Sequence, residues 1–263
     1  MVMDSFSLRQ AALRWGASLF GVADLDRLRT LPTQPENLLD GWTRAISLGV
    51  RLADPVLDDI VDGPTPLYAH HFRAVNIRLD DTALRLALLI QEAGGRALPL
   101  PASQAMDPVA CTSMISHKAV AVAAGLGWQG KSLLTISPLY GPRIRLCTVL
   151  TDLPLQPGRP LMNRCGNCTR CADACPAGAI KGTALPNEPG AHYESRDEAL
   201  HFERCRTLLQ EDFAKRPLIG HSVCGVCVKV CPWGARGKGV LHGRDDVPMT
   251  MMDDQFTLFP QSS

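Results

Sequence analysis

The sequence predicts an α/β domain over residues 1–160, a second domain over residues 161–235 and a C-terminal tail over residues 236–263. Two observations predict this division. Helical and strand-like patterns alternate through the first hundred residues, which is typical of a layered α/β domain rather than a helical bundle. Of the ten cysteines only Cys111 and Cys147 precede residue 161, so eight follow a linker at residues 154–164 that contains three prolines.

Composition argues against several functional classes. The formal net charge is +1 and 20% of the residues are charged, so the composition does not point to nucleic acid or to an anionic membrane. No apolar run approaches the ~18 residues that a membrane-spanning helix needs. The first residues, Met1 to Phe6, lack the basic segment of a secretory leader. We therefore expect a cytoplasmic, soluble protein with no membrane partner.

The first hundred residues predict two helices and three strands. A helix is expected to begin at Ser5 or Ser7 and to run through Arg14. A long helical pattern covers Thr65 to Glu92, with a bend within it, and its later part is apolar nearly all round, which predicts burial. Short runs of small or β-branched residues predict strands at residues 19–22, 45–50 and 97–100.

A glycine-rich loop follows an alanine-rich helix that Ser116 is expected to cap and Gly125 to end. Residues 125–132 match two known sequence motifs at once, G-x-x-x-x-G-K-S of a P-loop and G-x-G-x-x-G of a dinucleotide-binding fold. Both phosphate-binding mechanisms need a strand before the glycines and a helix after them. Here a helix precedes and residues 133–137 predict a strand, so we expect neither function and no binding of ATP by Lys131.

The segments that follow complete the predicted order of elements. Residues 133–137 and 143–151 are expected to pair as a hairpin, whose second strand has one more polar face. Residues 181–197 predict a polar loop, and residues 198–210 a helix that carries Cys205. The tail is expected to lie over the body of the protein or to be partly disordered.

The second domain contains a cysteine run spaced C-x2-C-x2-C-x3-C-P over residues 165–176. Bacterial ferredoxins hold cubane iron–sulfur clusters with this run, in which the fourth cysteine ligates the other cluster. An incomplete copy follows at residues 224–232. The spacing predicts a ferredoxin-like domain with two 4Fe-4S clusters. The expected ligands are Cys165, Cys168, Cys171 and Cys231 for the first cluster, and Cys175, Cys205, Cys224 and Cys227 for the second.

Two other interpretations of the cysteines are weaker. Zinc sites use paired C-x2-4-C knuckles separated by a longer loop, and three cysteines at successive short spacings overcrowd one zinc ion. A disulfide framework needs an oxidising compartment, which the absence of a secretory leader does not suggest.

An ordered series of motifs covers roughly residues 40–235: Ser116-His117-Lys118, the glycine loop, Gly141-Pro-Arg143 and the two cysteine runs. Together they resemble the epoxyqueuosine reductase family, more closely its short double-cluster 4Fe-4S relatives and more distantly reductive dehalogenases. The resemblance implies a nitroreductase-like fold for the first domain, a bound corrinoid such as cobalamin, and electron transfer through the clusters to cobalt.

The sequence departs from this family at two places. The aspartate proton donor of the tRNA-modifying reductase corresponds in position to Cys111, and its Glu-Arg pair to His117-Lys118. The chain also ends about thirty residues after Pro232, without the helical-repeat extension that helps the reductase to grip tRNA. We therefore do not expect tRNA as a partner, and no catalytic residue is predicted.

The resemblance implies a set of cofactor-binding candidates, for several of which a structural role is the simpler alternative. Trp128 can be a core residue, Cys111 a small apolar side chain, Arg44 one half of a surface salt bridge, and His117 a hydrogen-bonded structural histidine. The full set is Arg44, Cys111, His117, Lys118, Trp128, Lys131, Thr135 and Ser137.

Three functions fit these expectations. The first is an iron–sulfur reductase in which a donor such as ferredoxin or flavodoxin supplies electrons, through the clusters, to a corrinoid that reduces a small substrate. The second is an electron-transfer accessory protein that reduces the cofactor of a partner, for example a corrinoid protein that needs reactivation. The third is an FMN-dependent version of the first.

Overall fold

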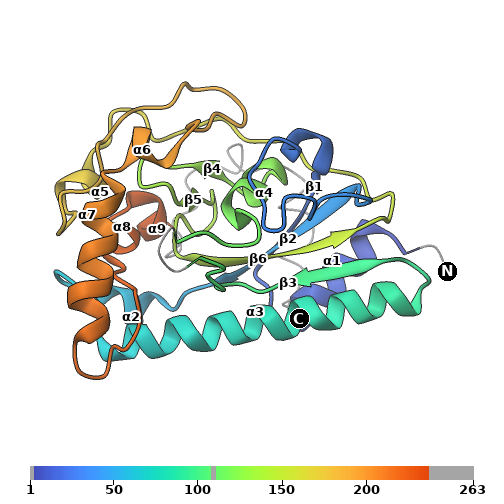
Figure 1. Cartoon of the computed structure of the whole chain (residues 1–263), viewed down its shortest axis with the longest axis horizontal. Coiled ribbons are helices and arrows are strands. Elements are labelled where there is room, and N and C mark those ends of the chain that lie inside the picture. The colour runs from blue at the N-terminus through green and yellow to red at the C-terminus, as the bar shows by residue number, and fades with distance from the viewer. Residues whose placement is uncertain (1–2, 108–110, 237–263) are drawn as a thin grey trace, which may run out of the picture.

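A computed structural model describes residues 3–107 and 111–236 of the chain. The predicted tail lies outside the described residues except for its first residue. At the centre is an antiparallel sheet in the order β1-β2-β6-β3 (Figure 1). Its strands are β1 (Leu19–Asp24), β2 (Arg44–Arg51), β3 (Ala97–Leu100) and β6 (Ile144–Thr151).

Helices cover both faces of this sheet (Figure 1). The helices α1 (Ser5–Arg14) and α3 (Pro66–Glu92) pack on one face, and α4 (His117–Ala123) packs on the other beside the short 3-10 helix η1 (Leu25–Leu28). Successive side chains of a strand point to opposite faces, so Ile46 joins the core beneath α3 and Ala45 the core beneath α4. The fold is therefore the predicted mixed α/β arrangement.

The helix boundaries follow from their caps. Asp4, one residue before the predicted start, accepts a hydrogen bond from the Ser7 amide at 2.8 Å and begins α1. Thr65 caps α3 in the same way. This helix runs for 27 residues without interruption, so the predicted bend is wrong. The predicted burial of the later part of this helix on all sides is also wrong, because Leu84 and Leu88 are half exposed on the face away from the sheet.

The predicted hairpin is wrong in its pairing. β5 (Thr135–Ile136) pairs with β4 (Trp128–Gln129) in a separate two-stranded sheet, whereas β6 lies between β2 and β3. A turn closed by the Leu133 amide and the Gly130 carbonyl occupies the first part of the expected strand, with Leu133 at a φ of 58°. β6 pairs with β2 along its whole length and with β3 at Thr148–Thr151, and not with β5.

The cysteine-rich region consists of short helices joined by loops. The predicted helix over residues 198–210 is divided, because the backbone at Leu200 is extended. Its helical elements are α5 (Arg170–Asp173), α6 (Arg196–Ala199), α7 (Phe202–Thr207), a π-helix (Leu208–Asp212), a 3-10 turn (Phe213–Lys215), α8 (Val226–Lys229) and α9 (Pro232–Arg236). The short helix α2 (Asp54–Asp58) belongs to the first domain. Ile219, Val223 and Val226 extend the core beneath α3, so the two regions share one core.

None of the helices in the described part of the chain combines the length and the apolar character that crossing a bilayer requires.

Candidate metal centres

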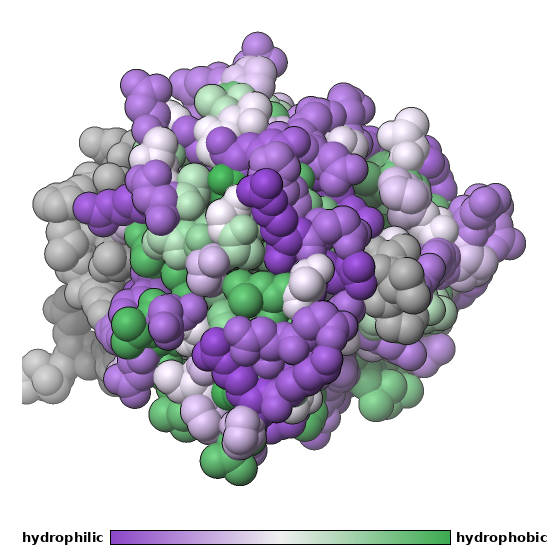
Figure 2. Space-filling model, turned by 60° about the vertical axis from the view of Figure 1, so that its left-hand side comes forward, coloured by the Kyte–Doolittle hydropathy of each residue, from purple (hydrophilic) through white to green (hydrophobic). Residues whose placement is uncertain are grey.

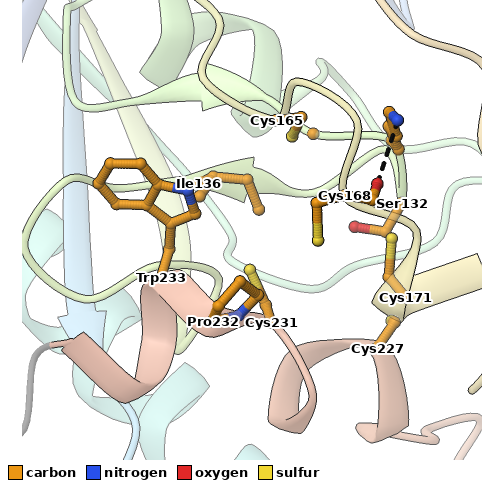
Figure 3. A pocket seen from close by; sticks show the side chains of 11 residues that line it. Ser132, Ile136, Cys165, Cys168, Cys171, Cys227, Cys231, Pro232 and Trp233 are labelled. Carbon is orange, nitrogen blue, oxygen red and sulfur yellow. Dashed lines mark hydrogen bonds between the residues drawn. The ribbon is translucent and has the colours of Figure 1, made fainter.

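The first three cysteines of the first run, Cys165, Cys168 and Cys171, lie with Cys231 around one cavity (Figure 3). Cys227, Trp233 and the residues Gly130 to Ser132 also line it. No three His, Cys, Asp or Glu side chains in the described ranges are grouped as ligands of a single metal ion. All ten cysteines are free thiols. Five thiols, from Cys165, Cys168, Cys171, Cys227 and Cys231, thus face one cavity, and the division of the cysteines into two ligand sets stays a prediction.

Local hydrogen bonds hold the loop of the first run in place. The Cys168 amide donates to the Cys165 carbonyl at 3.2 Å, which closes a turn. Asn163, which is buried, accepts a hydrogen bond from the Cys165 amide at 3.0 Å and donates one to the Gln129 carbonyl of β4 at 2.8 Å. This side chain fastens the cysteine loop to the first domain.

Burial and neighbouring thiols raise the pKa values of several cysteines. Burial, together with the nearby thiolates of Cys165 and Cys171, raises the pKa of Cys231 to about 11. Burial, together with Cys205 and Cys175, likewise raises the pKa of Cys224 to about 11.

Most of the charged neighbours of each thiol belong to its own predicted ligand set. Burial raises the pKa of Cys205, and Cys175 is the first charged neighbour to raise it further. Cys227 has neighbours in both predicted ligand sets. Its pKa is raised by burial, then by Cys224 and Cys205, and also by Cys171 of the other set. Buried thiols of this kind give up their protons when a metal centre supplies the compensating positive charge.

The loop of the second run is pressed against the first domain. Gly225, at a φ of 87°, begins α8, and a Cβ atom there would lie 2.4 Å from a methyl group of Ile60 and 2.8 Å from the ring of Tyr68. Only glycine fits both the backbone conformation and the space. The second set of thiols therefore lies directly beside the beginning of α3.

Arg143 joins the two domains through a buried network. Its guanidinium forms ion pairs with Asp54 at 2.9 Å and with Asp58 at 3.1 Å, and it donates to the Lys229 carbonyl of α8 at 3.4 Å. The side chain is 3% exposed, so its two carboxylate partners compensate a buried charge.

The glycine-rich loop is closely packed against neighbouring backbone. A Cβ atom on Gly125 would lie 2.5 Å from the Arg159 carbonyl oxygen of the linker, and one on Gly127 would lie 2.4 Å from the carbonyl oxygen of Ile136. The strand β5, and no helix, follows Lys131. The Lys131 ammonium donates to the Cys168 carbonyl at 3.1 Å instead. Lys131 is thus placed at the first set of cysteines.

His117 has a structural role. Its Nε2 lies 2.9 Å from the Pro101 carbonyl and its Nδ1 lies 2.8 Å from the Thr148 hydroxyl. A carbonyl only accepts, so Nε2 carries the proton and the Thr148 hydroxyl donates to Nδ1. Burial lowers the pKa of His117 to about 4, so the ring is neutral near pH 7.

Four other candidates also make internal contacts. Trp128 is buried and packs edge to face on Trp233, with ring centres 4.8 Å apart. Ser137 is fully buried and accepts from the Leu139 amide at 3.2 Å. The remaining two contacts are a hydrogen bond from the Thr135 hydroxyl to the Lys118 carbonyl at 3.4 Å and an ion pair between Arg44 and Asp24 at 3.2 Å.

Two candidates lie near the second set of thiols. The side chain of Lys118 is accessible to solvent. Partial desolvation nevertheless lowers the pKa of Lys118, and its charged neighbours include Arg145, Cys227 and Cys205. Cys111 is exposed, has a φ of 51° and raises the pKa of Cys205. The structure thus divides the eight candidates between several places and does not gather them into one cofactor cradle.

Arg145 was not predicted as a site residue. It donates to the Asn76 side chain at 3.1 Å and lies 4.0 Å from the centre of the Phe72 ring. It is also the first charged neighbour that lowers the pKa of Lys118. The signal in the sequence is an arginine inside an otherwise apolar strand.

The fold and the thiol groups together define the class of protein: a mixed α/β domain joined to a cysteine-rich module of the double-cluster iron–sulfur type. In agreement, residues 164–234 match a family described as "4Fe-4S double cluster binding domain".

Known relatives combine the same two parts. The chain is 32% identical over 123 residues to the epoxyqueuosine reductase of Bacillus cereus, a match that covers 46% of this chain and 30% of that protein. The epoxyqueuosine reductase structure from Streptococcus thermophilus superposes with a TM-score of 0.59 at 20% identity, over 88% of this chain and 66% of that one.

A reductive dehalogenase is also similar. The structure titled "Reductive dehalogenase structure suggests a mechanism for B12-dependent dehalogenation" gives a TM-score of 0.69 at 18% identity, over 87% of this chain and 31% of that chain. These structural likenesses show a common fold. The matched region spans only about a third of the length of the curated reductase.

Proposed function

We propose that this chain is an iron–sulfur reductase of the epoxyqueuosine reductase-like type. In this proposal a donor such as ferredoxin or flavodoxin supplies electrons to two 4Fe-4S clusters in a ferredoxin-like domain. The clusters pass the electrons to a corrinoid in a nitroreductase-like domain at residues 1–160, where a small substrate is reduced. The observation that carries the proposal is the cavity that Cys165, Cys168, Cys171 and Cys231 line together, with Cys227 in the same lining.

The donor set fits two cubane clusters. A 4Fe-4S cluster takes four thiolates, and two clusters account for every cysteine except Cys111 and Cys147. The cavity that Cys165, Cys168, Cys171 and Cys231 line is the proposed place of the first cluster. Cys175, Cys205, Cys224 and Cys227 are the proposed ligands of the second.

A corrinoid is proposed as the electron acceptor because a structural relative is described as B12-dependent. The position of Lys118 and Arg145 supports it. Lys118 is an exposed cation whose charged neighbours include Arg145 and the thiols of Cys227 and Cys205. These side chains would attract the negatively charged groups of a cofactor or substrate. A bound corrinoid would supply a cobalt centre that accepts electrons, which no side chain of the first domain can do.

Electron delivery from a small protein donor would take place at the cysteine-rich end of the molecule. Figure 2 turns this end, at the left of Figure 1, toward the viewer, and hydrophilic side chains predominate there around smaller apolar areas. Weak electron-transfer encounters bury little surface, which suits a polar face of this kind.

A second candidate function is an accessory protein that reduces the cofactor of a partner. The internal contacts of Arg44, Trp128 and Ser137 favour it, because these residues are occupied within the chain and are not free to hold a cofactor.

Titration of the anaerobically reconstituted protein with cobalamin and, separately, with FMN distinguishes these functions. The proposal expects cobalamin to bind and to be reduced when the clusters are reduced, as seen in its absorption spectrum. Lys118→Gln should weaken this binding, whereas Lys181→Gln, at an exposed lysine whose ammonium contacts the Asp197 carbonyl, should not. Binding of neither cofactor would favour the accessory protein, and binding of FMN alone would favour a flavin enzyme.

A further inference from the structure

Lys131 places a buried positive charge in the wall of the first cysteine cavity. The residue is 5% exposed and lines this cavity beside Cys165, Cys168 and Cys171 (Figure 3). Its ammonium donates a hydrogen bond of 3.1 Å to the Cys168 carbonyl, which is drawn as a dashed line in Figure 3. No carboxylate among the residues that the structure describes pairs with it.

A buried ammonium whose only acceptor is a neutral carbonyl is costly, because it has lost water without gaining an opposite charge. Arg143, the other strongly buried cation described above, has two carboxylates as compensation. The thiols that line the same cavity would become thiolates on binding a cluster and would then supply negative charge near Lys131. A cluster held by four thiolates is an anion, and each electron it accepts increases its negative charge.

A nearby positive charge therefore favours the reduced cluster over the oxidised one. Net charge and solvent exposure around a cluster are among the factors that set its reduction potential. Water screens the charge of Lys131 less than at the surface, because this side chain is buried in the cavity wall. The second set of cysteines has no lysine hydrogen-bonded to its own backbone among the described residues.

We propose that Lys131 sets the reduction potential of the cluster bound by Cys165, Cys168, Cys171 and Cys231, by stabilising the state that has accepted one electron. The proposal rests on the function proposed above, since it requires that cluster. Lys131 is thus a positioning residue for electron transfer, not a ligand, and the glycine loop serves to bring its ammonium to the cavity wall.

The test is a redox titration of the reconstituted protein followed by EPR, with variants that separate charge from hydrogen bonding. Lys131→Met removes both, Lys131→Gln keeps a donor without the charge, and Lys131→Arg keeps the charge. Both neutral variants should lower one of the two midpoint potentials so that the ratio of reduced to oxidised cluster falls at least tenfold, which is about 59 mV for one electron. The other midpoint should stay unchanged.

Two controls make the result specific. Lys131→Arg should keep the potential close to that of the unchanged protein. Lys181→Met removes an exposed lysine whose ammonium contacts the Asp197 carbonyl, and should shift neither midpoint.

Three results would overturn the proposal while leaving the proposed function intact. The first is that the midpoints of the neutral variants match those of the Lys181→Met control, and the second is that both midpoints shift equally. The third is that both neutral variants lose the first cluster, because a residue that only adjusts the potential is dispensable for assembly. Failure of the unchanged protein to assemble any iron–sulfur cluster would instead refute the proposed function itself.

Discussion

At the scale of single residues, burial decides what the titratable side chains of the first domain do. His117 belongs to a motif that suggests a cofactor contact, yet both ring nitrogens are occupied by Pro101 and Thr148. Lys118, its neighbour in the sequence, keeps an accessible side chain beside the second set of thiols. Adjacent residues of one motif thus have different roles, because α4 turns them in different directions.

The buried state of His117 predicts a specific dependence of stability on pH. Its pKa is about 4 in the folded protein and near 6.5 when unfolded, so the unfolded chain binds a proton more readily below pH 6.5. The contribution of His117 to the free energy of unfolding therefore decreases as the pH falls from about 6.5 to about 4. Between pH 7.5 and pH 5.5 the loss should be roughly 1 kcal/mol.

Thermal unfolding of the anaerobic protein at these two pH values measures this loss. The variant His117→Gln has no ring to protonate, so the fall in its stability should be smaller than that of the unchanged protein by roughly this amount. Equal pH dependence in the two proteins would show that His117 is accessible to protons in the folded state.

At the scale of elements, the loop after α4 and the linker to the cysteine-rich region hold each other in place. A Cβ atom on Gly125 would meet the Arg159 carbonyl oxygen at 2.5 Å, and one on Gly158 would meet the Ala124 carbonyl oxygen at 2.3 Å. Gly158 also donates a backbone hydrogen bond of 2.8 Å to Val22 of β1. The linker is therefore a packed segment that fixes the position of the first cysteine run.

A pair of glycine variants tests this contact. Gly125 and Gly94 have similar left-handed φ values, 78° and 86°, but nothing lies within 4 Å of a Cβ atom on Gly94. Gly94→Ala should cost about 1–2 kcal/mol of stability, which is the strain of the backbone alone. Gly125→Ala adds a clash with a backbone oxygen and should cost clearly more, as measured by thermal unfolding. Similar losses in both variants would contradict the close packing of the linker.

The sequence predicted the elements of the first domain better than their pairing. Strands β1, β2 and β3 and helices α1, α3 and α4 lie where local pattern placed them, because caps such as Ser116 and Thr65 act within one turn. The pairing of β5 with β4 was missed. It depends on a two-residue ladder and on the pairing of β6 with strands that are distant in the sequence, neither of which has a local signal.

At the scale of the whole molecule, cysteines from both runs meet at one cavity. Cys231 comes last in the chain but lines the cavity of the first run, whereas Cys175 of the first run neighbours Cys205 and Cys224. Spacing alone predicted these cysteines. It did not predict the supporting side chains Asn163 and Arg143, which come from outside the runs and act through hydrogen bonds to distant backbone.

The crossed arrangement predicts which cluster each cysteine variant loses. Cys231→Ala should remove or alter the cluster of the first run and leave the other, and Cys175→Ala should do the reverse, as seen in the separate EPR signals of the reduced protein. Cys147→Ala is the matched control, because this buried thiol donates to the Leu79 carbonyl and should affect neither cluster. Loss of the same signal in both the Cys231 and the Cys175 variants would contradict the crossed ligand sets.

The central claim is that the eight thiols hold two 4Fe-4S clusters. The most direct measurement is the iron, acid-labile sulfide and zinc content of the protein after anaerobic reconstitution. Two clusters of four irons predict about eight iron and eight sulfide ions per chain, with EPR signals from both clusters on reduction. Tightly bound zinc with no iron would contradict the account.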